Sequence, residues 1–459
     1  MSRFKLPNTY VIIAGIIILC AVLTWFVPGG QYVKADDGTL SYETVGSVPQ
    51  TWQVFTAIYH GFVKQAGIII FILVVGGAFW LLNATGAVEA GIKRFIVRIG
   101  KRDKLVLVAL TVLFSLAGAV FGMSEETIPF VGIVVPLTIS MGYDAFMGML
   151  VVYVASNVGF SSAFLNPFTV GIAQGMADLP LFSGMGYRLF CWAFLTLLLV
   201  VFVLVYARAL RLRSGTGPVG EPSPVGEPSP VGEPSPVGEP VEPLTRRQSW
   251  ILIVLLLTVV ALIVGVTCYE WYMAEITGLF LAMGIICAII AGFDTDRTVK
   301  ELMAGAKDIL SAALVVGFAS GIIVILQDGK IVDSILHSMQ EGLDGGGKAG
   351  SLSAMYGIQA VINFIIPSAT AKAAITIPIM APFADMTGVS RQAMVLAFQF
   401  GDGFTNMITP TSGVLVAALA MAKVPYTKWV KWIWKMVVAL LVLGLLLLLP
   451  TALFQIAGF

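Results

Sequence analysis

Charged residues are scarce in this chain. Only 12% of its 459 residues are Asp, Glu, Lys or Arg, whereas 58% are hydrophobic. A soluble globular protein carries about 25% charged and roughly 45–50% apolar residues, so the composition excludes an ordinary soluble domain. Its high hydrophobicity also excludes disorder, and a net charge of +1 gives no indication of nucleic-acid binding. A lipid bilayer is the solvent that this composition fits, and we expect an all-α polytopic membrane protein.

Reactive side chains are also few. The chain has two histidines and four cysteines that form no C-x-x-C pair, and we interpret the cysteines as small apolar core residues. No H-E-x-x-H motif occurs, and no G-x-S-x-G motif is accompanied by a plausible histidine, so we predict that the protein is not an enzyme. A G-x-x-x-x-G-K-[ST] phosphate loop is missing, which disfavours drive by ATP. We expect no cofactor other than a coupling proton or sodium ion.

Apolar runs of spanning length are abundant and fall into two sets. The first set covers residues 10–27, 65–85, 105–121, 128–141, 143–158 and 187–207. The second set covers residues 249–267, 275–292, 309–327, 351–366, 374–384, 391–400 and 430–455. A transmembrane helix needs about 20 apolar residues, so several runs are too short to span alone, and these cluster around two polar interruptions. No A-x-A cleavage pattern follows the first run, which we expect to be the first membrane helix rather than a signal peptide.

A proline-rich segment separates the two sets. Residues 215–244 contain four near-copies of Pro-Val-Gly-Glu-Pro-Ser and nine of the chain's 22 prolines. Such a segment has no apolar face to bury, and its prolines favour extended polyproline II backbone. We therefore predict a first membrane repeat over residues 1–214, a cytoplasmic linker over 215–244 and a second membrane repeat over 245–459.

Basic residues predict how the chain is oriented in the cell membrane. They cluster at the N-terminus, before residue 105, on both sides of the linker and after residue 422. Because such clusters mark cytoplasmic segments, we expect the N-terminus and the linker in the cytoplasm and the C-terminus outside. For the basic clusters to lie on the cytoplasmic side, residues 105–141 and residues 351–386 must each enter and leave the membrane on one side. We therefore predict that both segments are re-entrant hairpins. The two halves are then inverted repeats, each with a re-entrant hairpin and an interrupted helix.

The interrupted helices of the two halves share a sequence pattern. Residues 156–170 read SNVGFSSAFLNPFTV and residues 400–413 read FGDGFTNMITPTSG, so that Gly-Phe-Ser-Ser in the first matches Gly-Phe-Thr-Asn in the second. Each hairpin also has a serine-led polar tip, at 124–127 and at 368–370, followed by an apolar return that contains prolines. Irregular backbone at membrane depth is tolerated only where it lines a cavity or is buried in protein. Paired interruptions in two halves are typical of a transporter's binding site.

The polar side chains of the tips and breaks are the candidate site. Helix N-termini at such breaks present free N–H groups to a carboxylate, and Ser, Thr and Asn oxygens suit a substrate or a cation. The predicted substrate-binding residues are Ser124, Glu125, Glu126, Thr127, Ser156, Asn157, Ser161, Asn166, Ser368, Thr370, Asp402, Thr405, Asn406, Thr409, Thr411 and Ser412. A sodium ion could be held near Ser156, Asn157, Thr405 and Asn406.

Four charged residues in these stretches are candidates for proton or charge coupling. They are Glu125, Glu126, Lys372 and Asp402. A charge at bilayer depth costs about 2.5–3.5 kcal/mol on insertion scales, so its presence indicates a role. Three carboxylates and one ammonium give these four residues a net charge of −2. This charge favours a cationic substrate, or a zwitterion with a cationic group, over a dianionic substrate. Lys372 would pair either with Asp402 or with a substrate carboxylate.

The chain resembles the anaerobic C4-dicarboxylate carrier-like family, YfcC branch, at four places. These are VPGGQY at 27–32, MSEE at 123–126, FQFGDGFTN at 398–406 and TPTSG at 409–413. Relatives in the wider ion-transporter superfamily include dicarboxylate, aminobenzoyl-glutamate and arginine/ornithine carriers. The resemblance implies two inverted repeats, an elevator-type movement of the substrate-bearing domain and a homodimer. Sodium-coupled members often carry Ser-Asn-Thr at both tips, and the tips here lack the asparagine, which leaves proton coupling or exchange open.

These observations predict a secondary active transporter of small carboxylate-bearing metabolites, either C4-dicarboxylates or amino acids. It would work by alternating access, with proton or ion coupling or by exchange. A basic amino-acid antiporter of the arginine/ornithine type is the alternative within this class. A channel is a weaker interpretation, because a channel needs a continuous pore and usually builds its filter from repeated subunits or charge rings. The expected partners are a small-molecule substrate and the lipid bilayer.

Overall fold

Helices make up most of the part of the chain that the structure describes. It is a computed structural model and describes residues 9–34, 40–99, 103–124, 126–214, 243–342 and 347–459. The predicted linker lies outside the described residues except for its last two positions. A short antiparallel hairpin pairs β1 (Gly29–Lys34) with β2 (Leu40–Val45).

The helices follow one another in two series. The first series is α1 (Thr9–Phe26), α2 (Gln53–Lys64), α3 (Ala66–Ala84), α4 (Ala87–Ile99), α5 (Asp103–Phe121), α6 (Thr127–Ser140), α7 (Ala145–Met149), the π-helical turn η1 (Leu150–Val154), α8 (Ala155–Ser161), a second π-helical turn η2 (Pro167–Gly171), α9 (Ile172–Met176) and α10 (Met185–Ser214). The second series is α11 (Arg246–Tyr269), α12 (Met273–Ala291), α13 (Thr295–Asp308), α14 (Leu310–Asp328), α15 (Val332–Gly342), α16 (Gly347–Ile362), α17 (Ala369–Thr387), α18 (Arg391–Asn406), α19 (Gly413–Met421) and α20 (Tyr426–Leu453).

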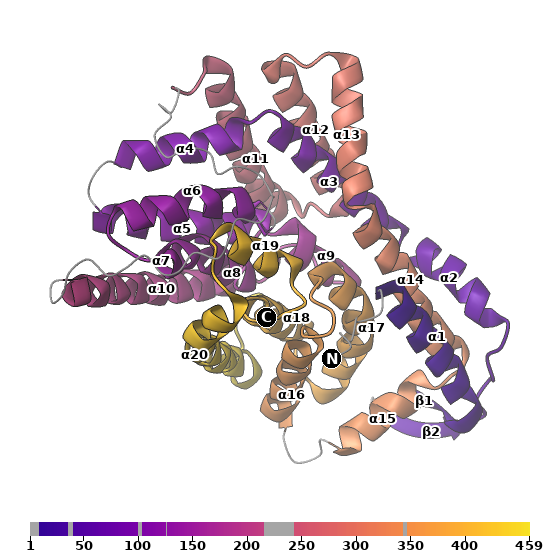
Figure 1. Cartoon of the computed structure of the whole chain (residues 1–459). Helices are drawn as coiled ribbons and strands as arrows, with labels where there is room; N and C mark the ends of the chain where they lie inside the picture. Colours follow the sequence, from indigo (N-terminus) through magenta and orange to yellow (C-terminus); the bar gives the residue numbers. More distant parts are fainter. Residues whose placement is uncertain (1–8, 35–39, 100–102, 125, 215–242, 343–346) are drawn as a thin grey trace, which may run out of the picture.

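These helices pack into two groups (Figure 1). The first helix group contains α1–α4 and α11–α14, and its broadest contacts are α2 on α14 and α3 on both α12 and α13. The second helix group contains α5–α10 and α16–α20, with α5 packed on α8 and α16 packed on α18. The largest contact between the groups is that of α14 with α17. α8 and α18 pack on each other and are buried along nearly their whole length, so they form the centre of the second helix group.

The predicted apolar runs and both predicted interruptions are confirmed. Each run falls on a helix, and the first break separates α8, which ends at Ser161, from η2, which begins at Pro167. The second break separates α18, which ends at Asn406, from α19, which begins at Gly413. Of the two polar tips, the described residues Ser124 and Glu126 lie between α5 and α6, and Ser368 lies between α16 and α17. The last residues of the tips, Thr127 and Thr370, belong to the first turns of α6 and α17. The β-hairpin and the amphipathic or short helices α2, α4, α13, α15 and α19 were not predicted.

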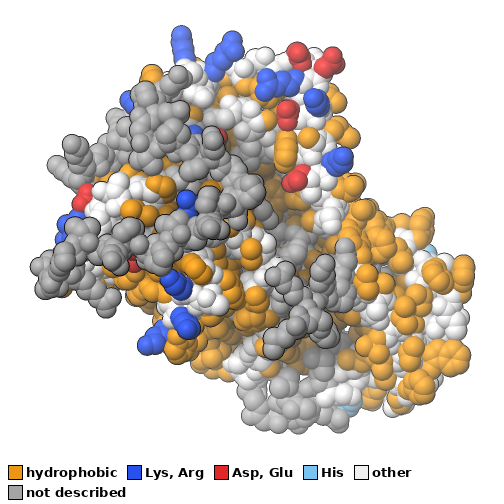
Figure 2. All heavy atoms as spheres, in the orientation of Figure 1, with side chains coloured by type: hydrophobic (Ala, Val, Ile, Leu, Met, Phe, Trp, Pro, Cys, Tyr) orange, Lys and Arg blue, Asp and Glu red, His pale blue; other side chains and the backbone are white. Residues whose placement is uncertain are grey.

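The surface agrees with a multi-pass membrane protein. Seven described helices are long and apolar enough to cross a membrane, namely α3, α5, α10, α11, α12, α14 and α20, and three shorter apolar segments accompany them. Figure 2 shows hydrophobic side chains covering the part of the surface formed by α1 and α2, at the right of the view. Charged side chains gather instead over α13 and the neighbouring helix ends, at the top. Backbone groups inside lipid must be paired internally, and helices achieve this pairing.

Candidate functional site

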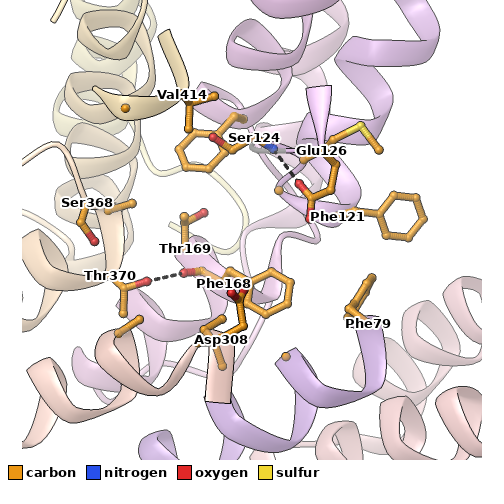
Figure 3. A pocket seen from close by; sticks show the side chains of 18 of the residues that line it. Phe79, Phe121, Ser124, Glu126, Phe168, Thr169, Asp308, Ser368, Thr370 and Val414 are labelled. Atoms are coloured by element: carbon orange, nitrogen blue, oxygen red, sulfur yellow. Dashed lines mark hydrogen bonds between the residues drawn. The ribbon is translucent and has the colours of Figure 1, made fainter. Parts of the chain in front are cut away.

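A cavity of about 960 Å³ lies between the two helix groups. The first helix group lines it with α1, α3 and the junction of α13 and α14. The second helix group lines it with the turn after α5, with α8 and η2, and with the starts of α17 and α19. Figure 3 shows how side chains from these distant segments surround one open space. Both tips and both breaks therefore meet at the same cavity.

Seven of the predicted binding residues line this cavity. They are Ser124, Glu126, Asn157, Ser368, Thr370, Asn406 and Ser412. Ser368 and Thr370 lie across the open space from Ser124 and Glu126 (Figure 3). Thr370 Oγ1 donates to the carbonyl oxygen of Phe168 at 3.4 Å, which holds the start of α17 against η2. Glu125 lies outside the described residues.

The charged side chains that line the described part of the cavity are both acidic. They are Glu126, in the turn after α5, and Asp308, the last residue of α13, and both are exposed. No Lys, Arg or His belongs to the described lining. The cavity therefore attracts positive charge. Asp308 was not predicted, and the one sequence signal for it is a carboxylate placed just before the apolar run that begins at residue 309.

Two helix N-termini also reach the cavity. α17 begins at Ala369 and α19 begins at Gly413, and the first residues of both helices line the space. Ser368 and Ser412 cap these helices, and their Oγ atoms accept hydrogen bonds from the N–H groups three residues further on, at 3.4 and 3.3 Å. The first N–H groups of a helix have no partner within it and carry partial positive charge. These two helix ends therefore suit a carboxylate.

The other predicted binding residues that the structure describes lie in helices or in the breaks and do not line the cavity. Thr127, Ser156, Ser161, Asn166, Asp402, Thr405 and Thr409 are buried, and Thr411 is half-buried. Ser156 Oγ donates to the carbonyl oxygen of Met123 at 2.5 Å. Asn166 caps η2, because its Oδ1 accepts a hydrogen bond from the N–H of Phe168 at 2.9 Å. In this conformation these side chains shape the tips and breaks and do not line the cavity.

Lys372 and Asp402 form a buried ion pair beside the cavity. Lys372 Nζ lies 2.7 Å from Asp402 Oδ1, and both side chains are 0% exposed. Asn406 connects the pair to the cavity, because Asn406 belongs to the lining and its Nδ2 donates to Asp402 Oδ2 at 3.1 Å. Of the two partners that the sequence left open for Lys372, the structure has Asp402. The pair is neutral as a unit, so the charge of the cavity comes from its own carboxylates.

Aromatic side chains hold the backbone of the second break. The carbonyl oxygens of residues 406–408 accept hydrogen bonds from Tyr153, Trp429 and Tyr426, at 3.0, 2.8 and 2.6 Å in that order. Carbonyl groups at membrane depth need such partners. The three bonds supply them from the protein itself, without an ion.

Two amide side chains that were not predicted connect these parts. Asn363, in the turn between α16 and α17, donates from Nδ2 to Thr405 Oγ1 at 2.8 Å. Gln399, in α18, donates from Nε2 to the carbonyl oxygen of Phe160 at 2.6 Å and so joins the second broken helix to the first. Both residues are fully buried. An amide inside an apolar run is the sequence signal that could have revealed them, because a buried amide needs a partner.

Two solved structures, both described as transport proteins, share this fold. The crystal structure of the Alcanivorax borkumensis YdaH transporter matches with a TM-score of 0.73 and 16% identity, over 96% of this chain and 98% of that chain. MtrF of Neisseria gonorrhoeae, described with a class of antimetabolite efflux pumps, matches with a TM-score of 0.71 and 16% identity, over 98% of this chain and 96% of that chain. Identities this low show the fold alone. With its seven apolar helices of spanning length among the described residues, the fold is that of a multi-pass membrane protein.

Sequence comparison identifies the family within that class. Residues 6–452 match the family DcuC, C4-dicarboxylate anaerobic carrier. The Escherichia coli K12 protein named "Putative basic amino acid antiporter YfcC" is 33% identical over 478 residues, which cover 94% of this chain and 93% of that protein. The chain belongs to the C4-dicarboxylate anaerobic carrier family, whose members are secondary transporters and not enzymes.

Proposed function

We propose that this protein exchanges amino acids with cationic side chains across the cell membrane. The observation that carries the proposal is the charge of the cavity. Glu126 and Asp308 face it, and its described lining has no basic residue. A cationic substrate would neutralise these carboxylates, whereas a dianion would be repelled by them.

A basic amino acid fits the cavity with both of its ends. Its α-carboxylate would lie at the N-termini of α17 and α19, near Ser368 and Ser412, where free N–H groups meet the cavity. Its side-chain cation would lie between Glu126 and Asp308. Since Ser368 and Thr370 lie across the open space from Glu126 (Figure 3), an extended substrate would bridge the two sides.

The relatives support two substrate classes. YfcC carries the name of a basic amino acid antiporter, and the family description names C4-dicarboxylates. The helix N-termini suit a carboxylate of either class. The cavity carboxylates favour the first class, so a C4-dicarboxylate carrier is our second candidate. It would require Glu126 and Asp308 to be protonated or to lie off the substrate path.

Charge neutralisation also gives a physical reason for exchange. An ionised side chain at the centre of a bilayer costs about 2.5–3.5 kcal/mol on insertion scales. A bound substrate cation lowers this cost for Glu126. Movement of the binding site across the membrane, in either direction, is therefore favoured only when a substrate is bound. An outgoing and an incoming cation would meet this requirement in turn. Antiport then needs no further ion.

We further propose that the two helix series are inverted repeats. Each contains a long helix interrupted at one residue, α2–α3 at Gln65 and α13–α14 at Ile309. When α1, α2 and α3 are matched with α12, α13 and α14, the contacts between the two series are reciprocal. The contact of α2 with α14 corresponds to that of α13 with α3, and the contact of α1 with α14 corresponds to that of α12 with α3. Reciprocal contacts of this kind are what a two-fold axis produces. The pairing leaves α11 as the additional crossing that inverts the second series.

Alternating access would follow from movement of the second helix group against the first. The second helix group carries both tips and both breaks, and the cavity lies at its boundary with the first. An elevator-type movement of this group would carry the substrate across the membrane. We place the N-terminus and the linker in the cytoplasm and the C-terminus outside, and we propose a homodimer held by the first helix group.

Counterflow in proteoliposomes tests the proposed substrate. Vesicles are preloaded with unlabelled arginine, ornithine or succinate and then receive the matching label outside, with protein-free vesicles as the control. We expect the label to accumulate with arginine and ornithine and not with succinate. Accumulation with succinate alone would make the protein a dicarboxylate carrier and would contradict the role of Glu126 and Asp308.

A further inference from the structure

The ammonium group of Lys372 occupies a buried pocket of oxygen atoms. Its Nζ lies 2.7 Å from Oδ1 of Asp402 and 3.2 Å from Oδ1 of Asn363, and the centroid of the Phe398 ring lies 5.1 Å away. Lys372, Asp402 and Asn363 are all fully buried. An ammonium in this position supplies the positive charge of a bound sodium ion and contacts two side-chain oxygen atoms, of a carboxylate and an amide, which are groups that also bind sodium.

This pocket joins the turn between α16 and α17 to the second break. Asn363 belongs to that turn, and its Nδ2 donates to Asn406 Oδ1 at 2.8 Å. Asn406 ends α18, lines the cavity and donates to Asp402 Oδ2 at 3.1 Å. Because the amide nitrogen of Asn363 is used toward α18, its oxygen is the atom that faces Lys372. The ammonium therefore holds the turn closed on α18.

The corresponding positions in the first half are apolar. When the two halves are matched at their Gly-Phe pairs, Val158 takes the place of Asp402. When the tips are matched at their leading serines, Ile128 takes the place of Lys372, four residues after the serine. Both charges are thus present in the second half and both are replaced in the first. The helices of a break can pack without this pair, so its presence indicates a role in the second half beyond packing.

We propose that Lys372 is a built-in cation, so that transport requires no sodium. The predicted sodium site comprised Ser156, Asn157, Thr405 and Asn406, and the ammonium lies beside its second half, because Asn363 contacts Lys372 as well as Thr405 and Asn406. A sodium ion would leave and rebind in each transport cycle, whereas the ammonium is covalently attached. The turn stays closed on α18 with or without substrate. Such a carrier is suited to exchange rather than to uphill drive by a sodium gradient. This last consequence rests on the proposed exchange function, and the cation pocket itself does not.

Three variants test separately the negative charge of Asp402 and the volume that the Lys372 side chain fills. Lys372→Ala leaves the Asp402 carboxylate uncompensated beside an empty space, Lys372→Met leaves the carboxylate but fills the space, and the double variant K372A/D402N leaves the space without the charge. The melting temperature of the purified full-length protein is measured at pH 8 in sodium chloride and in choline chloride of equal ionic strength. We expect sodium to raise the melting temperature of K372A by roughly 2–4 °C. The wild type, K372M and the double variant should not respond.

Two melting results would overturn the proposal. If the wild type responds to sodium as strongly as K372A, the native pocket is not filled by the ammonium. If K372A is stabilised by acid but not by sodium, the pocket takes a proton and is not a site for a metal ion. Should K372A fail to fold, the wild type decides, because sodium-dependent stability or sodium-dependent counterflow of the wild type would equally contradict the proposal. Melting requires no substrate, so an error in the proposed substrate would leave this test intact.

Discussion

Glu126 and Asp308 face the same cavity from different helix groups. Glu126 lies in the turn after α5, in the second helix group, and Asp308 lies where α13 meets α14, in the first. In the proposed movement Glu126 travels with the substrate while Asp308 stays in place. Asp308 would therefore contact the substrate in one end state only. In the proposed cycle the two carboxylates would both contact the cation in the conformation seen here and would move apart on passage.

Neutralising either carboxylate should weaken the binding of arginine. We expect Glu126→Gln and Asp308→Asn each to raise KM for arginine by roughly tenfold, which corresponds to about 1.4 kcal/mol of lost binding free energy. Initial rates of arginine uptake measure the effect. Asp296→Asn is the matched control, because Asp296 is an exposed acid on the same helix α13 and does not line the cavity. An unchanged KM in both cavity variants would contradict recognition by charge.

Asp402→Asn should abolish transport. The variant leaves the Lys372 ammonium unpaired at 0% exposure, and breaking a buried ion pair from one side costs about 3–5 kcal/mol. We expect counterflow to be lost while the chain is still found in the membrane fraction, because the helices that insert are long and apolar. Normal transport by this variant would show that the pair has no role in the cycle.

At the scale of the helices, the second helix group depends on one close crossing. α5 and α8 approach each other at two glycines, so that a Cβ atom on Gly118 would lie 2.1 Å from the carbonyl oxygen of Ser156. A Cβ atom on Gly159 would lie 1.8 Å from the carbonyl oxygen of Ser115. Small residues allow membrane helices to pack this closely. The crossing positions α8, and with it Asn157, against the cavity.

Gly159→Ala should destabilise the protein. The new Cβ atom meets backbone rather than a movable side chain, and overpacking of this kind costs about 1–3 kcal/mol or more. Gly278→Ala in α12 is the control, because nothing lies within 4 Å of a Cβ atom there and alanine favours the helix by up to about 1 kcal/mol. Thermal melting in detergent compares the two. An equal melting temperature for both variants would mean that α5 and α8 are not packed as described.

At the scale of the whole molecule, the cavity lies at the boundary between the two helix groups. Phe79 of α3 and Phe168 of η2 meet there, with ring centroids 5.4 Å apart. Phe62 of α2 and Phe318 of α14 are also 5.4 Å apart but lie within the first helix group. Relative movement of the groups would separate the first pair and not the second.

Cross-linking should therefore block transport at one of these pairs only. In a variant that lacks the four native cysteines, we expect mercuric ion to stop exchange by F79C/F168C and a reducing thiol to restore it. The same treatment of F62C/F318C should change the exchange rate of that variant little. Exchange that continues through a complete F79C–F168C cross-link would rule out movement of one group against the other.

Much of the fold could be predicted because membrane helices require long apolar runs, which are visible in the sequence. The run predicted at 249–267 is α11, and the breaks could be located because glycine, proline and polar residues interrupt runs at matching places in both halves. The direction of each side chain could not be predicted in this way. Ser156 and Asn157 are neighbours, yet only Asn157 lines the cavity, because successive residues of a helix point about 100° apart.

Contacts between distant segments were also beyond prediction. Asp308 is the last residue of the amphipathic helix α13, and its place at the cavity depends on how α13 and α14 lie against the second helix group. The choice of Asp402 as the partner of Lys372 depends on how α17 packs on α18. Such choices are made by tertiary packing, which local hydropathy does not report.

Exchange of cationic amino acids is the central claim, and uptake into loaded and empty vesicles tests it most directly. Proteoliposomes are filled with ornithine, with succinate or with buffer alone, and labelled arginine is added outside with sodium absent and with the pH equal on both sides. The account predicts rapid arginine uptake into the vesicles that contain ornithine and almost none into the others. Equal uptake into empty vesicles, or uptake driven by internal succinate, would contradict it.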